Sequence, residues 1–281
     1  MQVYSVDTGY FKLDGGAMFG VVPKVIWNKL NQADENNLCS WAMRCMLVVD
    51  GDQRILIDTG LGNKQSEKFF SHYYLHGEGE LLKSLKQLGF GVEDITDVIL
   101  THLHFDHCGG AVSRVDETLQ PTFPKATYWS TKKHWDWAMN PNSREKASFL
   151  KENFVPLQEH GQLKFIAENE SGLTKFNDKI DILFANGHTQ SMMLPIIQYK
   201  NKTICYMADL IPSSAHVPLP YVMGYDMFPM TTLIEKEKFL NKACDKDYIL
   251  FYEHDPVAEC STIELTEKGF KRKDVFNLDT I

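Results

Sequence analysis

Short apolar runs separated by turn residues recur along the chain and predict β-strands. Asp50–Gly51 is a turn dipeptide between two such runs and predicts a β-hairpin, and Lys200–Lys202 is a second candidate turn. The predicted strands are Val3–Val6, Met43–Val49, Arg54–Asp58, Val98–Leu100, Ala126–Ser130, Ile180–Ala185, Leu194–Tyr199, Thr203–Met207 and Tyr248–Tyr252.

Between these runs, apolar residues at helical spacing predict helices at Leu81–Leu88, Thr131–Met139 and Thr232–Lys246. Gly89 is placed to end the first helix, and Thr131 is a candidate N-cap of the second. Strands and helices alternate in both halves of the chain. This pattern predicts an α/β protein with two sheets between helical layers.

One stretch fits neither pattern: Gly9–Asn37 is apolar but punctuated by glycine and proline, and we expect an irregular segment there. Long irregular segments of compact domains are often functional, so it is a candidate substrate lid or dimer contact. No repeat, low-complexity tract or Pro/Gly/Ser-rich linker divides the chain. We therefore expect residues 1–281 to form a single domain.

Composition narrows the class of protein. The formal charge of −8 over 281 residues argues against nucleic acid as a partner, because nucleic acid is usually bound by a basic face. No apolar run approaches the roughly 20 residues needed to cross a bilayer, and the first residues lack the pattern of a signal peptide. The six cysteines stand singly, as is typical of reduced thiols, so we expect a cytoplasmic protein that makes no membrane contact.

Three imidazoles and a carboxylate follow the predicted strand Val98–Leu100 almost at once, as His102, His104, Asp106 and His107. Residues two apart in an extended chain point the same way, so His102 and His104 can converge on one ion. Asp106 and His107 come where two following glycines allow a tight turn, and they can face a second ion. Imidazole and carboxylate ligands suit zinc, and also iron, manganese or cobalt.

Three further candidates each stand just beyond a predicted strand: His188, Asp209 and His254. Any one of them alone would more often be a helix cap or a surface group. Together they share residue type and strand-end position with the first cluster. Since open α/β sheets place their sites at strand ends, we expect all seven side chains to form one metal site.

These residues resemble the motifs of metallo-β-lactamase-fold hydrolases, and the resemblance covers most of the chain. It implies a four-layer αβ/βα sandwich with two metal ions in a cleft at its edge. The matching motifs, in chain order, are Asp58–Thr59–Gly60, His102–Leu103–His104–Phe105–Asp106–His107, Gly187–His188, Ala208–Asp209 and Glu253–His254. The ligands implied are His102, His104 and His188 for the first ion, Asp106, His107 and His254 for the second, and Asp209 for both.

The resemblance also implies a mechanism. A hydroxide bridging two divalent ions would attack a carbonyl or phosphoryl centre, with Asp209 fixing the spacing of the ions. Asp106 would pass a proton to the leaving oxygen. Asp106 and Asp209 are therefore the candidate catalytic residues, and the cofactor is expected to be two divalent ions, with zinc the first choice.

Within this family the chain is similar to N-acyl-homoserine-lactone lactonases, which are quorum-quenching enzymes, and to their organophosphate-hydrolysing relatives. Asp14–Lys24, Asp209–Pro212 and Gly224–Asp226 carry that likeness. The expected substrate is a small molecule with an apolar acyl part, first of all an acyl-homoserine lactone. The alternatives are an organophosphate triester or aryl ester, and, in another class, a non-catalytic metal-binding sensor.

One departure concerns the substrate contacts. Some lactonases carry a tyrosine three residues after the bridging aspartate, where this chain has Pro212. We expect His216 or Tyr225 to take its place, and Phe19 and Phe105 to line an acyl pocket. Of the remaining histidines, His72 and His76 are expected at the surface, and His134 and His160 at the surface or on a helix face. The resemblance alone suggests a homodimer.

Overall fold

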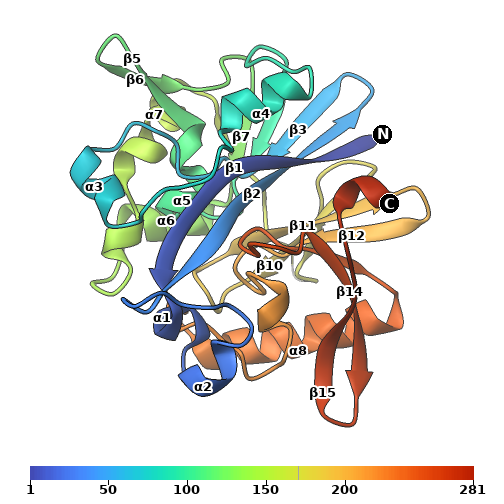
Figure 1. Cartoon of the computed structure of the whole chain (residues 1–281). Helices are drawn as coiled ribbons and strands as arrows, with labels where there is room; N and C mark the ends of the chain where they lie inside the picture. The colour runs from blue at the N-terminus through green and yellow to red at the C-terminus, as the bar shows by residue number, and fades with distance from the viewer. Residues whose placement is uncertain (170) are drawn as a thin grey trace.

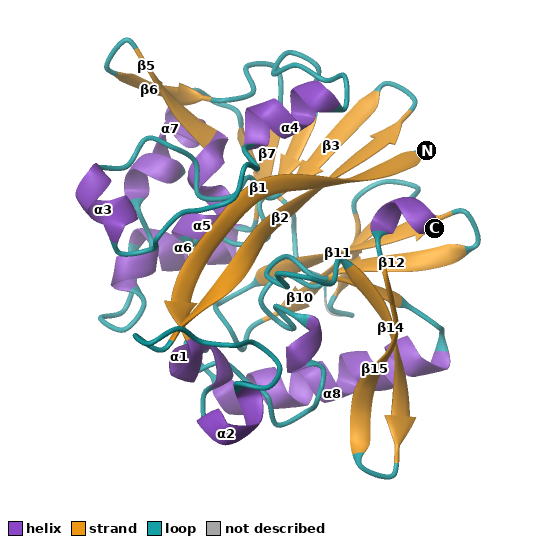
Figure 2. Cartoon of the chain, in the orientation of Figure 1, coloured by secondary structure: helices purple, strands orange, loops and turns teal. Residues whose placement is uncertain are grey.

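The computed structural model describes residues 1–169 and 171–281 as two facing β-sheets covered by helices (Figures 1 and 2). The first sheet has the strand order β1-β2-β3-β4-β7-β8, and the second has the order β15-β14-β13-β12-β11-β10-β9. The strands of the first sheet are β1 (Gln2–Asp14), β2 (Leu38–Asp50), β3 (Gln53–Ile57), β4 (Asp97–Ile99), β7 (Thr127–Ser130) and β8 (Leu163–Phe165). Those of the second are β9 (Leu173–Lys175), β10 (Ile180–Ala185), β11 (Met192–Tyr199), β12 (Lys202–Tyr206), β13 (Ile249–Phe251), β14 (Cys260–Thr266) and β15 (Gly269–Phe276).

The helices are short except for the last, α8, which lies along the outer side of the second sheet (Figure 2). A separate small hairpin pairs β5 (Val112–Val115) with β6 (Thr118–Pro121). The helices are α1 (Gly15–Phe19), α2 (Lys24–Trp27), α3 (Glu67–Ser71), α4 (Leu81–Gln87), α5 (Phe105–Cys108), α6 (Lys132–Met139), α7 (Val155–Glu159) and α8 (Pro229–Asp245).

Side-chain alternation along the strands builds the layers. On β3, Ile55 and Ile57 point into the core between the two sheets, while Leu56 points into the core beneath α4, α6 and α7. The period of two in a strand supplies both faces from one buried segment. Phe239 and Leu240 of α8 close the central core from the other side. The predicted α/β sandwich is confirmed.

Most of the predicted elements are present with shifted ends. The hairpin at Asp50–Gly51 joins β2 to β3, Gly89 follows α4 with φ +90°, and the Thr131 side chain caps α6. The expectation of an irregular Gly9–Asn37 was wrong in part, because β1 continues to Asp14 and two short helices follow. The pairing of β1 with β2 shifts register between Asp7 and Tyr10. The alternation of side chains is interrupted there, so the sequence pattern does not show one long strand.

Five strands deliver the candidate site. β3 and β4 run parallel, as do β12 and β13, so their carboxyl ends meet at one edge of each sheet. Asp58 and most of the candidate ligands follow these ends within a few positions, and His188 follows β10, which β11 separates from β12. Strand ends therefore bring together residues that are far apart in the sequence.

Two further observations bear on the expectations from composition. Among the residues that the structure describes, no helix has both the length and the apolar character needed to cross a membrane. All six cysteines are free thiols, and five of them are buried. Cys244 is the partly exposed one.

Candidate metal centre

The seven predicted ligands converge at the edge of the sandwich, and all are at least nine-tenths buried. In the first group, His188 Nε2 lies 3.2 Å from His104 Nδ1 and 3.0 Å from Asp209 Oδ2. His102 Nε2 lies 3.7 Å from the same carboxylate oxygen. Three imidazole nitrogens and one carboxylate thus face a common point, as the ligands of a single ion do.

The second group lies beside the first. His254 Nε2 is 3.2 Å from His107 Nε2 and 3.8 Å from Asp106 Oδ2. Asp106 Oδ2 is also 3.7 Å from His107 Nε2. Both Asp106 and His107 belong to the short helix α5, which begins directly after His104. Two imidazoles and a carboxylate therefore form a second set of ligand atoms.

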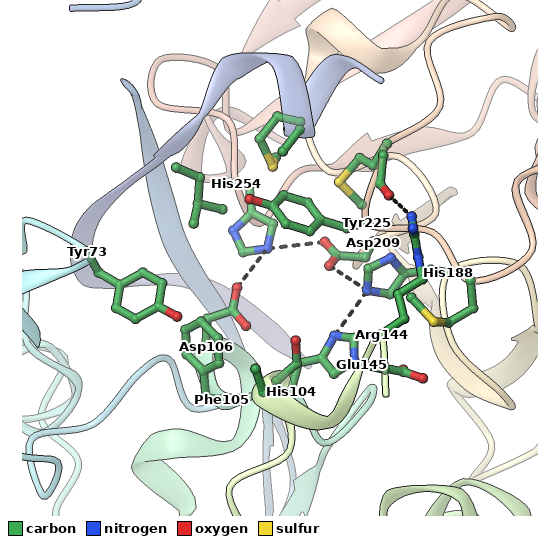
Figure 3. Close-up of a pocket in the computed structure, with 18 residues that line it drawn as sticks. Tyr73, His104, Phe105, Asp106, Arg144, Glu145, His188, Asp209, Tyr225 and His254 are labelled. Atoms are coloured by element: carbon green, nitrogen blue, oxygen red, sulfur yellow. Dashed lines mark hydrogen bonds and ion pairs between the residues drawn. The ribbon is translucent and has the colours of Figure 1, made fainter. Parts of the chain in front are cut away.

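Asp209 faces both groups. Its Oδ2 lies 3.5 Å from His107 Nε2 as well as near His188, while its Oδ1 lies 3.2 Å from His254 Nε2 (Figure 3). The residue before it, Ala208, has a φ of +41°, which is uncommon for a residue with a side chain. This strained conformation of Ala208 directly precedes Asp209 and helps to place the Asp209 carboxylate between the two groups.

Each histidine of the site holds its outer ring nitrogen on a protein acceptor and turns the other nitrogen inward. His102 illustrates the logic. The Thr101 hydroxyl donates its proton to Asp58 at 2.6 Å, so it accepts from His102 Nδ1–H at 3.1 Å. The lone pair of His102 is therefore on Nε2, which is buried and has no hydrogen-bond partner among the described residues.

The other two histidines of the first group are held by carboxylates from distant loops. His104 Nε2 donates to Glu145 at 2.9 Å, and His188 Nδ1 donates to Asp226 at 2.8 Å. Glu145 also accepts from Trp137 at 2.6 Å. Such outer partners fix the tautomer and orientation of a metal-binding histidine.

The loop that carries His188 is pressed against the start of α8. A Cβ on Gly187 would lie 2.2 Å from Thr232 Oγ1, so only glycine fits there. Glu235 of α8 accepts from the backbone N–H groups of Asn186 and Gly187. The contacts with α8 therefore fix the position of the loop that carries His188.

The histidines of the second group are held by the strands themselves. His107 Nδ1 lies between two buried carboxylates, 3.2 Å from Asp58 and 3.0 Å from Glu253. His254 Nδ1 donates to the backbone oxygen of Ala42 on β2 at 2.8 Å. Burial raises the pKa of Glu253 to about 8, against the pull of His107.

The electrostatics of the cluster favour positive charge at its centre. Burial lowers the pKa of His188, but the carboxylates of Asp209 and Asp226 outweigh it and raise that pKa to about 10. Burial and the neighbouring imidazoles drive the pKa of His102 well below its usual range. Because the buried carboxylates attract cations and the unpartnered nitrogen of His102 is an acceptor, the residues present fit divalent metal ions.

The cluster forms the floor of a cavity of about 430 Å³ (Figure 3). Arg144 stands at its rim and donates to the backbone oxygen of Gly224 across the opening. Tyr73 and Tyr225 lie on its walls near Asp106. The apolar lining comes from Leu13, Ala17, Met18, Phe105, Ala147, Met223 and Met227.

The four predicted substrate contacts separate into two pairs. Tyr225 and Phe105 line the cavity. His216 and Phe19 are fully buried behind its wall, where their rings stack at a centroid distance of 4.5 Å. His216 Nε2 meets the backbone oxygen of Met18 at 2.9 Å, so this histidine supports a residue of the lining.

The expected surface histidines are exposed, with one exception. His134 lies on the helix α6, which is one of its two expected positions, but only 1% of it is exposed, so the alternative of a surface position was wrong. Two backbone groups of the ligand loops hydrogen-bond its ring, and no sequence spacing shows this. Sequence reasoning missed Glu145, Tyr73 and Arg144, because each reaches the site from a loop without a recognisable motif. Asp226 belongs to the stretch Gly224–Asp226 that carries the family likeness, but no sequence pattern assigned it a role as the partner of His188.

The family profile described as "Metallo-beta-lactamase superfamily" matches residues 44–254, which is most of the chain and includes every candidate ligand. The chain belongs to the metallo-beta-lactamase superfamily. This confirms the predicted family and the predicted fold, and it places the chain among metal-dependent hydrolases.

Curated relatives of this superfamily member include N-acyl homoserine lactonases at low identity. One from Bacillus thuringiensis is 23% identical over 232 residues, covering 78% of this chain and 82% of that enzyme. One from Bacillus cereus is 32% identical, but over 84 residues, so the match spans 26% of this chain and 34% of that enzyme.

Solved structures agree with the fold over almost the whole chain. A probable metal-dependent hydrolase from Staphylococcus aureus superposes with a TM-score of 0.88 at 25% identity, covering 100% of this chain and 98% of that one. AidC, a dizinc quorum-quenching lactonase in complex with a product, superposes with a TM-score of 0.80 at 24% identity, covering 98% and 95%. The latter likeness shows the shared fold.

Proposed function

We propose that this chain is a dinuclear metal-dependent hydrolase that opens the ring of N-acyl-homoserine lactones. The observation that carries the proposal is the set of five histidines, each with one ring nitrogen anchored on the protein and the other turned toward Asp209. Binding the inner nitrogens to metal ions satisfies them without disturbing any outer hydrogen bond.

The ligand division follows the two groups. His102, His104 and His188 would hold one ion, and Asp106, His107 and His254 would hold the other. Asp209 would contribute to both, since its oxygens face both groups. Nitrogen and oxygen donors of this kind suit zinc, with iron, manganese and cobalt as alternatives. When bound, two such ions lower the pKa of water and polarise a substrate carbonyl oxygen.

The cavity above the cluster supports an amphiphilic substrate. Its walls are mostly apolar and suit an acyl chain, whereas its floor is made of histidine and carboxylate atoms. A lactone ring placed at the floor would leave its acyl tail against Met18, Met223 and Phe105. Relatives named as N-acyl homoserine lactonases favour this substrate class over others.

Two residues of the chain are assigned to the lactone itself. Asp106 lies at the cavity floor and is suited to take up the proton that the attacking water loses and to deliver it to the oxygen released on ring opening. Tyr225 lies on the wall near it, and its hydroxyl is a hydrogen-bond donor. It takes the place of the tyrosine that Pro212 does not provide.

Hydrolysis of N-acyl-homoserine lactones by the metal-loaded protein, followed in a pH-stat, tests the proposal. We expect kcat/KM above about 10⁴ M⁻¹s⁻¹, loss of that activity on chelation, and loss in Asp209→Ala. The exposed Asp52→Ala on the turn between β2 and β3 is the control and should retain activity.

Other outcomes distinguish the alternatives. Metal-dependent cleavage of an aryl phosphotriester or aryl ester without lactone turnover would keep the metal centre and overturn the lactonase assignment. Ligand binding with no turnover of any of these substrates would favour a metal-binding sensor.

A further inference from the structure

His134 is a buried histidine that the metal centre does not use as a ligand. It stands on α6, two residues after that helix begins, and its backbone N–H donates to the capping hydroxyl of Thr131 at 3.0 Å. At this helix position a longer acidic side chain commonly folds back onto the N-cap. The His134 ring instead points away from its own helix and reaches two separate loops.

One ring spans the two loops that supply the first group of ligands. Its Nε2 accepts from the backbone N–H of Leu103 at 2.8 Å, and its Nδ1 meets the backbone oxygen of Gln190 at 2.6 Å. Leu103 stands between His102 and His104 in the sequence. Gln190 follows His188 by two residues.

These contacts fix the state of the ring. Because Nε2 accepts from an N–H group, its lone pair is free of a proton, and the single ring proton is on Nδ1, which donates to Gln190. A cationic ring could not accept from Leu103. Burial agrees with this, since it lowers the pKa of His134 to about 4.

Neighbouring contacts reinforce the same connection. The Thr131 hydroxyl lies 2.8 Å from the hydroxyl of Ser191, a residue that turns the chain with φ +61° after the His188 loop. Phe149 packs against both His104 and His134, with ring centroids at 4.8 and 5.7 Å. Residues at the start of α6 therefore hydrogen-bond both loops that carry the histidines of the first group.

Among the residues that the structure describes, His134 makes no hydrogen bond to a ligand of the second group. His107 and His254 are oriented by Asp58, Glu253 and Ala42, which belong to the ends of β-strands or to a strand itself. We propose that His134 is a positioning residue that holds the two loops of the first group at the separation needed to bind the first ion, without acting on the second. This inference rests on the dinuclear centre of the proposed function.

Substitutions at His134 can remove both hydrogen bonds of the ring or only one of them. His134→Phe keeps the approximate volume and removes both hydrogen bonds. His134→Gln places an amide oxygen near the former Nε2 and can keep the contact to Leu103. Trp135→Phe disturbs the same helix at a buried residue that packs against Phe154, and it is the matched control.

The measurement is binding of Co²⁺ and Zn²⁺ to chelator-stripped protein, by titration calorimetry and by the visible spectrum of bound Co²⁺. His188→Ala and His254→Ala provide reference spectra for proteins that lack a ligand in the first or second group. We expect His134→Phe to weaken one of two binding steps by about 10- to 100-fold and to retain a spectrum like that of His188→Ala. His134→Gln should recover part of the affinity, and Trp135→Phe should bind both ions normally.

Three results would count against the proposal. Unchanged binding of both ions in His134→Phe, with a lower unfolding temperature alone, would make His134 an ordinary core residue. Equal weakening of both binding steps would remove the selectivity. A retained spectrum that matches His254→Ala would place its action on the other group. If the unaltered protein binds fewer than two ions, the dinuclear centre itself fails, which is a separate result.

Discussion

Two histidines of the first group, His104 and His188, and the two histidines of the second group are held by different kinds of structure. Glu145 and Asp226, which orient His104 and His188, lie on loops that also line the cavity. His107 and His254 are oriented instead from strand ends and from β2, inside the core of the sandwich. Substitutions in the loops that line the cavity should therefore weaken binding of the first ion more than binding of the second.

The largest effect should come from the strand-end support. Asp58 accepts from the backbone N–H of Thr101 at 2.7 Å and from its hydroxyl at 2.6 Å, besides holding His107. Asp58→Asn keeps the φ of +58°, which asparagine tolerates, but replaces one acceptor oxygen by a donor. We expect a loss of about 2–4 kcal/mol in unfolding free energy and weaker binding of the second ion through His107, with a smaller effect on the first ion through Thr101 and His102.

Chemical denaturation and metal titration measure the two quantities. Asp52→Asn, on the exposed turn between β2 and β3, is the control and should behave like the unaltered protein. Weaker binding of the first ion alone in Asp58→Asn would contradict the claim that the strand ends chiefly support the second group.

A smaller effect is expected from the loop support. In Glu145→Gln an amide N–H₂ replaces one of the oxygens that accept from His104, Trp137 and Thr189. We expect the affinity for the first ion to fall about tenfold, with KM raised because the same segment lines the cavity. Unfolding free energy should fall less than in Asp58→Asn. Equal loss of both ions would show that the loops and strands are not separate supports.

The cavity wall should affect selectivity without affecting metal content. Met223 lines the cavity and is buried among Phe19, Trp41 and their neighbours. Met223→Ala enlarges the apolar wall, so kcat/KM should shift toward longer acyl chains by about 3- to 10-fold relative to short ones. A series of acyl-homoserine lactones of increasing length measures the shift. Loss of metal would contradict a role confined to the wall.

A separate effect, on the pH dependence of stability and not on the metal centre, concerns His216, which lies outside both groups. Burial lowers its pKa to about 3, so between about pH 6.5 and 3 the unfolded chain binds a proton that the folded protein does not. Stability contributed by the neutral ring is present above pH 6.5 and falls as the pH drops, by at most about 1.4 kcal/mol per pH unit. In His216→Phe the unfolding temperature should vary less between pH 6.5 and 4.5.

Metal-free protein should be used for this pH series, so that loss of ions does not contribute. His160→Phe, at an exposed histidine, is the control and should keep the original slope. An unchanged slope in His216→Phe would show that His216 is protonated in the folded protein.

Much of the architecture was predictable because it depends on local patterns. The hairpin at Asp50–Gly51, the cap at Thr131 and the buried strands follow from turn chemistry and side-chain alternation over a few residues. The C-terminal hairpin of β14 and β15 was missed, since its outer strand is charged and exposed and shows no alternation. The extension of β1 to Asp14 was missed because the register shift between Asp7 and Tyr10 has no sequence pattern of its own.

The sequence by itself determined the family and the candidate ligands, because these residues come in short motifs fixed to strand ends. Only the tertiary structure decided what holds them. Glu145 is separated from His104 by 41 positions and Asp226 from His188 by 38, and nothing in local propensity links such pairs. His134 shows the same point most clearly. A histidine on a helix is ordinarily a surface residue. Here the packing of α6 against two loops buries a neutral ring that hydrogen-bonds both of them.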